Sequence, residues 1–455
     1  MPKRAKKCAF YTLGCKVNQY DTESLMRLFR ERGYDIVDFD SPADVYCINT
    51  CTVTQVSDKK SRQAIRRAKK RNPSAVVAVV GCYAQAAPEE AAAIPGVDVV
   101  AGTRERGALV DMVEKAMQGE GPVVRVHPGS RDEPFEELPI DGFASRVRGF
   151  VKVQDGCDEY CSYCKVPYAR GRSRSRRLEN VLAEVERLVE AGHKEIVITG
   201  VHLGAYGRDL AELRPGVAPD LAWLVEKVHE VRGVGRVRLS SVEPLDVTCG
   251  LIRVVADLPG VAKHFHIPLQ SGDDAVLARM NRNYRASDYE RLVGRIREAV
   301  SPVGITTDIM VGFPGETDDM FVRSYEFVRR IGFSRMHVFK YSRRPGTYAA
   351  RMPGQVDPAT KQARSEEMIE LGRELAERFH LSLVGGREEV LVEEHDRDRG
   401  MVTGLGSTYV RAEFPGTVDQ VGEFVSVSIV SARSDLVQAE RVVSGQEGFE
   451  ARSEN

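Results

Sequence analysis

The sequence predicts an α/β protein in three parts: an N-terminal α/β domain with a parallel sheet, a central partial (β/α)6 barrel and a C-terminal all-β barrel. Short apolar runs alternate with helical patterns over about the first hundred residues, and six strand-like runs alternate with helical patterns in the middle of the chain. The last part switches to period-two alternation with Gly and Pro turns. At 455 residues, the chain is long enough for several domains of ordinary size.

The N-terminal domain, predicted over residues 1–120, has a cysteine after each of three strand-like runs. The runs "CAFYTLGC", "VYCINTC" and "SAVVAVVGC" end at Cys15, Cys51 and Cys82. Because the loops after parallel strands converge on one crevice, these three thiols can hold a metal cluster with one iron left open. Free cysteines are also common in protein cores, and the residues alone leave both interpretations open.

Residues 121–145 are predicted to form a linker, because the pattern there gives way to Gly, Pro and charged residues. The barrel is predicted over residues 146–375 and the C-terminal module over residues 380–445. The strand-like runs of the barrel lie at residues 149–154, 195–199, 236–241, 264–270, 304–312 and 335–342. In barrels of this class the chemistry lies in the loops at the C-terminal ends of the strands.

A cysteine motif follows the first strand of the predicted barrel. The stretch "GCDEYCSYCKVPYARGRSRSRR" places Cys157, Cys161 and Cys164 at a C-x3-C-x2-C spacing. A structural zinc site needs a fourth ligand, and the nearest downstream histidine, His193, lies in a turn after a helical pattern. A [4Fe-4S] cluster held by three thiolates leaves one iron free to chelate a small molecule with an amine and a carboxylate. The sequence therefore favours an open iron–sulfur cluster.

Two basic clusters lie close to the cysteine loops, at residues 59–71 and 165–177. The formal net charge is only -1, so affinity for an anionic partner must come from local patches. Arginine-rich segments bind RNA phosphates, whereas an isolated basic helix is more often a solvated charged face. Two such clusters beside two cysteine loops favour RNA binding. The candidate residues are Arg66, Arg67, Arg170, Arg172 and Arg174.

The chain has no export or membrane signal in its sequence pattern. The N-terminus lacks an apolar core of signal-peptide length, and the longest apolar run, residues 75–82, is too short to span a bilayer. Nine cysteines without an export signal suggest a reducing compartment. We therefore expect a cytoplasmic protein with no membrane partner.

Several motifs resemble those of a known superfamily. The C-x3-C-x2-C motif after the first strand of a partial barrel resembles the radical S-adenosylmethionine (SAM) superfamily. The stretches "TLGCKVNQYDTE", "INTCTVTQVSDKK", "VVGCYAQ", "HIPLQSGDDAVLARMNR", "TDIMVGFPGET" and "RRPGTYAARM" resemble the methylthiotransferases, and most of all the tRNA N6-threonylcarbamoyladenosine methylthiotransferases. The similarity covers nearly the whole chain, and the C-terminal module resembles the TRAM RNA-binding barrel.

The resemblance implies two [4Fe-4S] clusters and SAM as cofactors. It implies a radical cluster on Cys157, Cys161 and Cys164 and an auxiliary cluster on the three N-terminal cysteines, with SAM acting as methyl donor and as radical source. The SAM-binding residues that it implies are Tyr163, Gly200, Glu243, Gln270 and Gly312.

The implied reaction adds a methylthio group to C2 of the threonylcarbamoyladenosine next to the anticodon. An adenine C2–H bond has no acidic proton and no leaving group, so a radical is needed to replace that hydrogen. The implied partners are a tRNA anticodon stem-loop and an electron donor such as flavodoxin or ferredoxin. Isopentenyladenosine in tRNA and an aspartate of a ribosomal protein are alternative substrates for the same chemistry. A non-catalytic iron–sulfur protein that binds RNA or senses redox state is the alternative from another class.

The sequence departs from the family pattern at two lysines. Lys165 follows Cys164 where an aliphatic residue is expected, and Lys340 stands in place of an expected proline. Both can alter the edge of the cofactor pocket or the approach of the substrate. Three further cysteines match no ligand position and are interpreted as structural: Cys8, Cys47 and Cys249. Cys47 lies four residues before Cys51 and is an alternative ligand.

Overall fold

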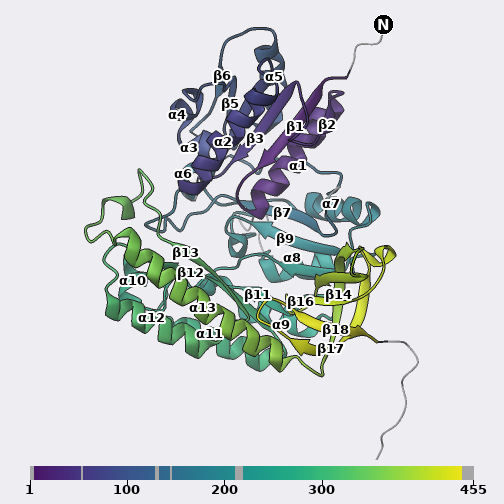
Figure 1. Ribbon diagram of the computed structural model, residues 1–455, viewed down its shortest axis with the longest axis vertical. Coiled ribbons are helices and arrows are strands. Elements are labelled where there is room, and N and C mark those ends of the chain that lie inside the picture. Colours follow the sequence, from purple (N-terminus) through teal and green to yellow (C-terminus); the bar gives the residue numbers. More distant parts are fainter. Residues whose placement is uncertain (1–4, 53–54, 129–132, 144–145, 211–218, 443–455) are drawn as a thin grey trace, which may run out of the picture.

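The computed structural model describes residues 5–52, 55–128, 133–143, 146–210 and 219–442. Figure 1 shows an N-terminal α/β domain at the top, a β/α barrel below it and a small β-barrel at the lower right. The three units have the classes and the order that the sequence predicts. None of the described helices has the length and the apolar character needed to cross a membrane.

The N-terminal domain is built on a parallel sheet with the strand order β2-β1-β3-β4-β5-β6. The strands are β1 (Lys7–Thr12), β2 (Asp35–Val37), β3 (Val45–Thr50), β4 (Val76–Gly81), β5 (Val99–Ala101) and β6 (Val123–Arg125). The helices are α1 (Lys16–Glu31), α2 (Gln55–Arg71), α3 (Cys82–Ala86), α4 (Pro88–Ala92) and α5 (Leu109–Met117). Because α1 and α5 cover one face and α2, α3 and α4 the other, β3 and β4 are buried along their whole length.

The predicted linker, residues 121–145, contains strand β6, which pairs with β5 and extends the first sheet. Residues 133–143 then run along both domains. The carbonyl oxygen of Leu138 accepts hydrogen bonds from the Tyr20 hydroxyl at 3.2 Å and from the Ser24 hydroxyl at 2.9 Å. Ile140 and Phe143 lie in the core of the barrel. This segment therefore packs against the domains that it joins.

The central unit is a partial barrel with six parallel strands, as the sequence predicts. They are β7 (Gly149–Asp155), β9 (Glu195–Gly200), β10 (Arg236–Leu239), β11 (His264–His266), β12 (Gly304–Val311) and β13 (Arg335–Lys340). Backbone bridges join β10 to β11, and the short β8 (Arg174–Ser175) adds an antiparallel strand beside β7. The described strands do not pair β13 with β7, so the barrel is open between these two strands.

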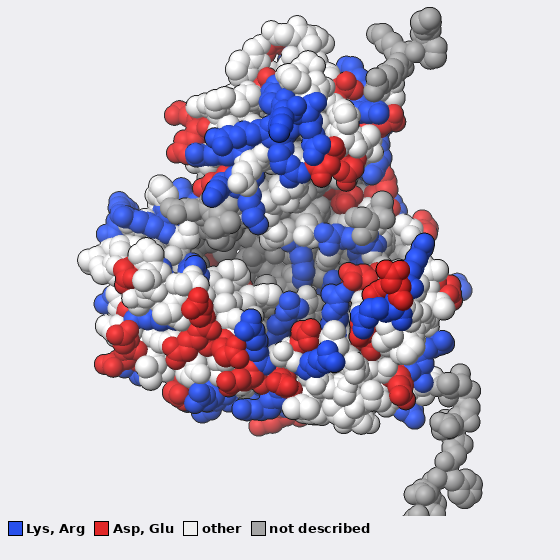
Figure 2. Space-filling view, viewed as in Figure 1, with Lys and Arg blue, Asp and Glu red and all other residues white. Residues whose placement is uncertain are grey.

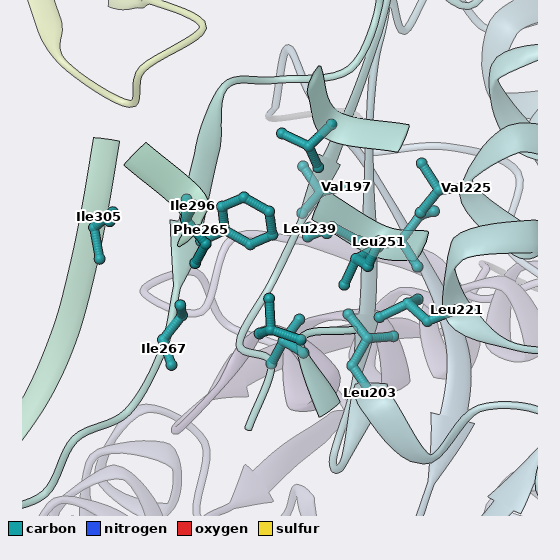
Figure 3. Packing of buried hydrophobic residues seen from close by; sticks show 14 of the residues in the cluster. Val197, Leu203, Leu221, Val225, Leu239, Leu251, Phe265, Ile267, Ile296 and Ile305 are labelled. Atoms are coloured by element: carbon teal, nitrogen blue, oxygen red, sulfur yellow. The ribbon is translucent and has the colours of Figure 1, made fainter. Parts of the chain in front are cut away.

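Helices cover the outside of the barrel, except for the short α6 (Val166–Arg170), which packs against α3 of the N-terminal domain. The covering helices are α7 (Leu178–Glu190), α8 (Leu221–His229), α9 (Cys249–Asp257), α10 (Asp274–Arg279), α11 (Ala286–Ala299), α12 (Asp318–Ile331) and α13 (Pro358–Ser382). Figure 3 shows Leu239 and Phe265 of the strands beside Leu251 of α9, and all three side chains are buried in one apolar core. This core fixes the strands, and the strand ends in turn position the loops that carry the cysteines.

The C-terminal module is a closed five-stranded barrel with the strand order β14-β15-β16-β18-β17. The strands are β14 (Arg387–Asp396), β15 (Met401–Leu405), β16 (Arg411–Pro415), β17 (Phe424–Ala432) and β18 (Val437–Arg441). Its turn at residues 406–409 docks where the barrel strands begin. Arg238 donates a hydrogen bond to the carbonyl of Gly406 at 2.8 Å, and the ring of Tyr409 stacks on His264 with centroids 4.4 Å apart. The module thus closes the end of the barrel opposite the cysteine loop.

Candidate functional site

Cys157, Cys161 and Cys164 lie on the loop that leaves the C-terminal end of β7. Two backbone hydrogen bonds shape this loop, from the Cys157 amide to the Gly171 carbonyl at 3.0 Å and from the Cys164 amide to the Cys161 carbonyl at 2.9 Å. All three cysteines are free and half-buried. The loop therefore presents three thiols at the end of the barrel where enzymes of this architecture carry their chemistry.

Hydrogen-bond donors surround these thiols. Arg282 lies 3.4 Å from the Cys161 sulfur, and the Val166 amide lies 3.4 Å from the Cys164 sulfur. His202 Nδ1 is 3.8 Å from the Cys157 sulfur. Burial raises the pKa of Cys164 to about 12, so an uncompensated thiolate is disfavoured there without a cation or a metal.

Arg282 and His202 are site residues that sequence reasoning missed. Both lie inside stretches that carry the family resemblance, "ARMNR" and "VHLG", but a lone arginine or histidine in a loop gives no signal of its own. Arg282 also donates to a carboxylate oxygen of Glu243 at 2.6 Å, and His202 Nε2 lies 2.7 Å from Asp246 Oδ2. These contacts connect the cysteine loop to the ends of β9 and β10.

The five residues predicted to bind SAM all lie at this same end of the barrel. Gly200 ends β9, Gln270 lies just past β11, and Gly312 follows β12. Glu243 follows β10 and contacts Arg282, and Tyr163 packs edge-to-face against Phe313 with ring centroids 6.4 Å apart. The structure therefore brings Tyr163, Gly200, Glu243, Gln270 and Gly312 to the strand ends around the cysteine loop.

Cys15, Cys51 and Cys82 follow three adjacent strands, β1, β3 and β4. Cys15 is exposed, and the other two are buried. A Cβ atom on Gly14, the neighbour of Cys15, would lie 3.1 Å from the Cys51 sulfur, so the two loops approach closely. The pKa of Cys82 is raised to about 11, mainly by burial and to a smaller extent by the charges of Cys51 and Cys15, against the opposing effect of Arg170. The three thiols are therefore neighbours.

The two cysteine triads are not packed as ligands of a single bound ion. No group of three or more His, Cys, Asp and Glu side chains within the described ranges is placed so that it could hold a metal ion. The N-terminal triad instead has its three thiols at the ends of three parallel strands, and the barrel triad has its three thiols on the loop after one strand, β7.

A buried network of charges joins the two cysteine regions. Arg170 is 1% exposed, and its Nε lies 3.3 Å from the Cys82 sulfur. Its other nitrogens donate to Asp21 of the N-terminal domain at 2.9 Å and to Asp155 of β7 at 3.0 Å. Asp155 lies two residues before Cys157. One guanidinium therefore contacts the auxiliary cysteines and the base of the other cysteine loop.

The burial of Arg170 corrects its predicted RNA-binding role, and Arg174 needs the same correction. Both side chains are buried, and Arg174 donates to the Arg170 carbonyl at 3.0 Å. A buried guanidinium is stable only when it is paired. Arg170 is paired with Asp21 and Asp155 inside the protein, and Arg174 lies 3.8 Å from Asp155. Arg172 is exposed and lies 3.4 Å from a carboxylate oxygen of Asp158.

Arg66 and Arg67 are exposed on α2. Arg67 pairs with Asp40, and its guanidinium lies over the ring of Phe39 at 5.4 Å. Figure 2 shows Lys and Arg side chains gathered on the N-terminal domain, above a hollow between this domain and the barrel. This surface keeps the cationic character that the sequence indicates.

The remaining cysteines and the two unusual lysines lie away from the thiol triads or at their edge. Cys8 and Cys47 lie in the apolar core of the N-terminal domain, whereas Cys249 is exposed at the start of α9. Lys340 donates to Gln362 of α13 at 2.5 Å. Lys165 begins the turn after Cys164, and burial lowers its pKa.

Comparison with protein families supports a two-part match. The radical SAM superfamily matches residues 151–328, and the family described as Uncharacterized protein family UPF0004 matches residues 7–102. The matched ranges contain all six cysteines of the two triads.

Similar proteins of known name cover nearly the whole chain. The threonylcarbamoyladenosine tRNA methylthiotransferase MtaB of Bacillus subtilis is 41% identical over 428 residues, which are 93% of this chain and 94% of that protein. The protein of the same name from Thermotoga maritima is 39% identical over 94% of this chain and 97% of that protein. A tRNA-2-methylthio-N(6)-dimethylallyladenosine synthase of Pelotomaculum thermopropionicum is 36% identical over 94% of this chain and 96% of that protein.

A solved structure shares the fold. The radical SAM methyltransferase TsrM of Kitasatospora setae, solved with cobalamin and a [4Fe-4S] cluster, superposes with a TM-score of 0.51 at 16% identity. The match covers 76% of this chain and 77% of that chain. The identity and coverage of the curated relatives establish more than the fold: the chain belongs to the tRNA methylthiotransferase family of the radical SAM superfamily.

Proposed function

We propose that this protein adds a methylthio group to C2 of N6-threonylcarbamoyladenosine next to the anticodon of tRNA. The observation that carries the proposal is the pair of cysteine triads, one on each α/β unit, with Arg170 in contact with Cys82 and with Asp155. Two relatives at 39–41% identity are named for this reaction. Their coverage of the whole chain supports assigning the same activity to the whole protein.

The cysteines fit two iron–sulfur clusters that each keep one iron open. In each triad three thiols gather at strand ends, and an arginine donates to one of them, Arg282 to Cys161 and Arg170 to Cys82. Arginine donors neutralise thiolate charge and tune a cluster. When bound, the two [4Fe-4S] clusters and SAM supply the radical and the sulfur chemistry that the adenine C2–H bond requires.

The protein groups hold and shield the reacting parts. We assign Cys157, Cys161 and Cys164 to the radical cluster and Cys15, Cys51 and Cys82 to the auxiliary cluster. SAM would lie at the strand ends near Tyr163, Gly200, Glu243, Gln270 and Gly312. Arg282 would orient the Glu243 carboxylate, because it donates to that carboxylate at 2.6 Å. The apolar core beneath the loops holds this arrangement rigid.

The anticodon stem-loop is the proposed macromolecular substrate. An unpaired loop base can be extended toward the barrel end, and exposed cations such as Arg66 and Arg172 can bind the phosphates on either side. The C-terminal β-barrel is a second proposed RNA-binding unit. A flavodoxin or ferredoxin of the cytoplasm is the proposed electron donor.

Anaerobic reconstitution followed by a turnover assay tests the proposal. Two clusters predict about eight irons per chain, and reduction in the presence of SAM should release a cleavage product of SAM. A threonylcarbamoyladenosine stem-loop should gain the methylthio group. Four irons per chain without SAM cleavage would instead indicate a non-catalytic iron–sulfur protein. A methylthio product only from an isopentenyladenosine stem-loop, or only from a ribosomal-protein aspartate, would show that this alternative is the substrate.

A further inference from the structure

Two basic side chains at the open side of the barrel have no ion-pair partner among the residues that the structure describes. Lys16 begins α1, which packs against β7 and β9, and Arg335 begins β13. Among the described residues, neither side chain forms an ion pair or a hydrogen bond. Since the barrel is open between β7 and β13, the two cations stand at its two edges.

The surroundings of Arg335 form a polar surface inside the barrel. The register of the strands aligns His266 with Thr306 and Thr306 with Arg335, and the next pair of β12 and β13 on the same face is Asp308 and His337. His266 Nε2 lies 3.4 Å from Asp308 Oδ1, and the His266 and His337 ring centroids are 6.1 Å apart. Arg335 and His337 are exposed on this face, while Met336 and Val338 between them pack against the core of the barrel.

Lys16 shares this space although it belongs to the other domain. Burial lowers the pKa of His337, Asp308 opposes this effect, and the charges of Arg335, His266 and Lys16 lower the pKa further. The charges of Lys16 and Arg335 both act on Tyr409 as well. Both cations are therefore close to His337 and to Tyr409.

Two other cations near this surface are paired with acids. Arg238 donates to Glu195 at 2.7 Å, and Arg148 pairs with Glu393 at 2.7 Å. Asp308 is an acid on the surface near Arg335, and its Oδ1 lies 3.4 Å from His266 Nε2. Lys16 and Arg335 therefore leave an excess of positive charge on this side of the barrel, and Lys16 is the sequence neighbour of Cys15. A small anion that reaches the auxiliary cysteines would find its counter-ions here.

We propose that Lys16 and Arg335 bind the carboxylate of the threonylcarbamoyl group and so select the substrate. This inference rests on the proposed function. A carboxylate forms charge-assisted hydrogen bonds with both cations. A dimethylallyl group is apolar and uncharged, so the two cations add nothing to its binding affinity. Neither residue takes part in the bond changes of the reaction. Both act by positioning the base.

Binding of three anticodon stem-loops to the reconstituted holoenzyme tests the inference. One stem-loop carries threonylcarbamoyladenosine, the second its carboxamide, which has the same shape without the charge, and the third dimethylallyladenosine. The wild type should prefer the carboxylate over the carboxamide by about 10- to 100-fold in Kd, as expected for hydrogen bonds to a charged group. Arg335→Met should reduce this preference to within about threefold, and Arg335→Lys should keep part of it.

Lys340→Met is the matched control, because Lys340 lies on the same strand but its side chain donates to Gln362 of α13. The control should keep the preference. Lys16→Met should reduce it as Arg335→Met does, and its iron content must equal that of the wild type because Cys15 is adjacent.

Three outcomes separate the possibilities. If the wild type methylthiolates threonylcarbamoyladenosine and Arg335→Met keeps the full preference for the carboxylate, the inference is wrong and the proposed function stands. If Arg335→Met weakens the binding of all three stem-loops by the same factor, Arg335 binds an RNA phosphate and the inference is likewise overturned. If the wild type prefers the dimethylallyl stem-loop and makes product only from it, the proposed function fails together with the inference.

Discussion

Arg170 Nε lies 3.3 Å from the Cys82 sulfur, and the same guanidinium bonds Asp155 at the end of β7. The contact spans 88 residues of sequence and joins the N-terminal domain to the barrel. A fully buried arginine in this position fixes the distance between the two cysteine regions and places a positive charge against one auxiliary thiol.

Arg170→Lys should impair the function of the auxiliary cluster more than the stability of the fold. Lysine keeps the charge but cannot contact Cys82, Asp21 and Asp155 together, so we expect methylthio transfer to fall about 10- to 100-fold. The reduction potential of the auxiliary cluster, measured by electron paramagnetic resonance in a variant without the three barrel cysteines, should also shift, because a hydrogen bond to a ligand sulfur is lost.

Arg106→Lys is the control for this prediction. Arg106 pairs with Asp21 and bonds Glu136 at 2.7 Å, in the same buried network, and it has no contact with Cys82 among the described residues. Equal reduction potentials of the auxiliary cluster in Arg170→Lys and Arg106→Lys would show that the contact of Arg170 with the Cys82 sulfur does not tune that potential.

Asp21 should make the domain interface acid-sensitive. Burial alone would raise its pKa, but Arg106, Lys152 and Arg170 together lower the pKa to about 2. An aspartate in an unfolded chain has a pKa of about 3.9, so the stabilisation is complete above about pH 4 and is lost as the pH falls toward 2. A shift of this size corresponds to about 2–3 kcal/mol of unfolding free energy.

Asp21→Asn should lower the unfolding free energy by about 3–5 kcal/mol at pH 7, because it leaves three buried cations with one anion fewer. It should also lose less stability than the wild type between about pH 4 and about pH 2 in urea unfolding. Asp111→Asn, which removes an exposed partner of Arg32, should stay within about 1 kcal/mol of the wild type. The same pH dependence in Asp21→Asn and the wild type would contradict the assignment.

Gly304→Ala should disturb the docking of the C-terminal barrel. A Cβ atom on Gly304, at the start of β12, would lie 2.0 Å from the Thr408 carbonyl oxygen, so the docked turn must move. We expect the free energy of unfolding to fall by about 1–3 kcal/mol and amide exchange in residues 404–410 to become faster. Gly294→Ala, in α11 with no other atom within 4 Å, should stabilise the protein by about 0.5–1 kcal/mol. If exchange near Thr408 is unchanged in Gly304→Ala, the turn does not dock as described.

The exposed face of α2 should contribute to tRNA affinity by binding the phosphates of the tRNA backbone. Arg62, Arg66 and Lys70 are exposed and lie four residues apart, on one side of the helix. Each substitution by alanine should weaken tRNA binding for every sequence and reduce the slope of log K against log salt by about 0.7–0.9. Arg291→Ala, on the outer helix α11, is the control and should leave the slope unchanged. Unchanged salt slopes in the α2 variants would show that this helix does not bind tRNA phosphates.

The strands and both cysteine triads could be predicted because their signals are local. Each cysteine follows an apolar run, and adjacent parallel strands bring Cys15, Cys51 and Cys82 to one edge of the sheet whatever the rest of the chain does. The barrel strands are apolar runs between helical patterns. For the same reason, the five predicted SAM-binding residues lie at the strand ends.

The buried arginines could not be predicted because their partners are distant in sequence. Arg170 meets Asp21 across 149 residues, and Arg282 meets Cys161 across 121 residues. A run of arginines has the same pattern whether it faces water or a buried carboxylate, so composition favours the solvated interpretation. The docking of Tyr409 on His264 also depends on how two units meet.

Mass spectrometry of the nucleosides from a single-turnover reaction tests the central claim most directly. The reconstituted protein would be mixed anaerobically with SAM, a reductant and two anticodon stem-loops, one with threonylcarbamoyladenosine and one with isopentenyladenosine. We predict the 2-methylthio derivative of threonylcarbamoyladenosine, lost when Cys82 or Cys157 is replaced by alanine. A methylthio product from isopentenyladenosine alone, or a product that persists in Cys82→Ala, would contradict the account.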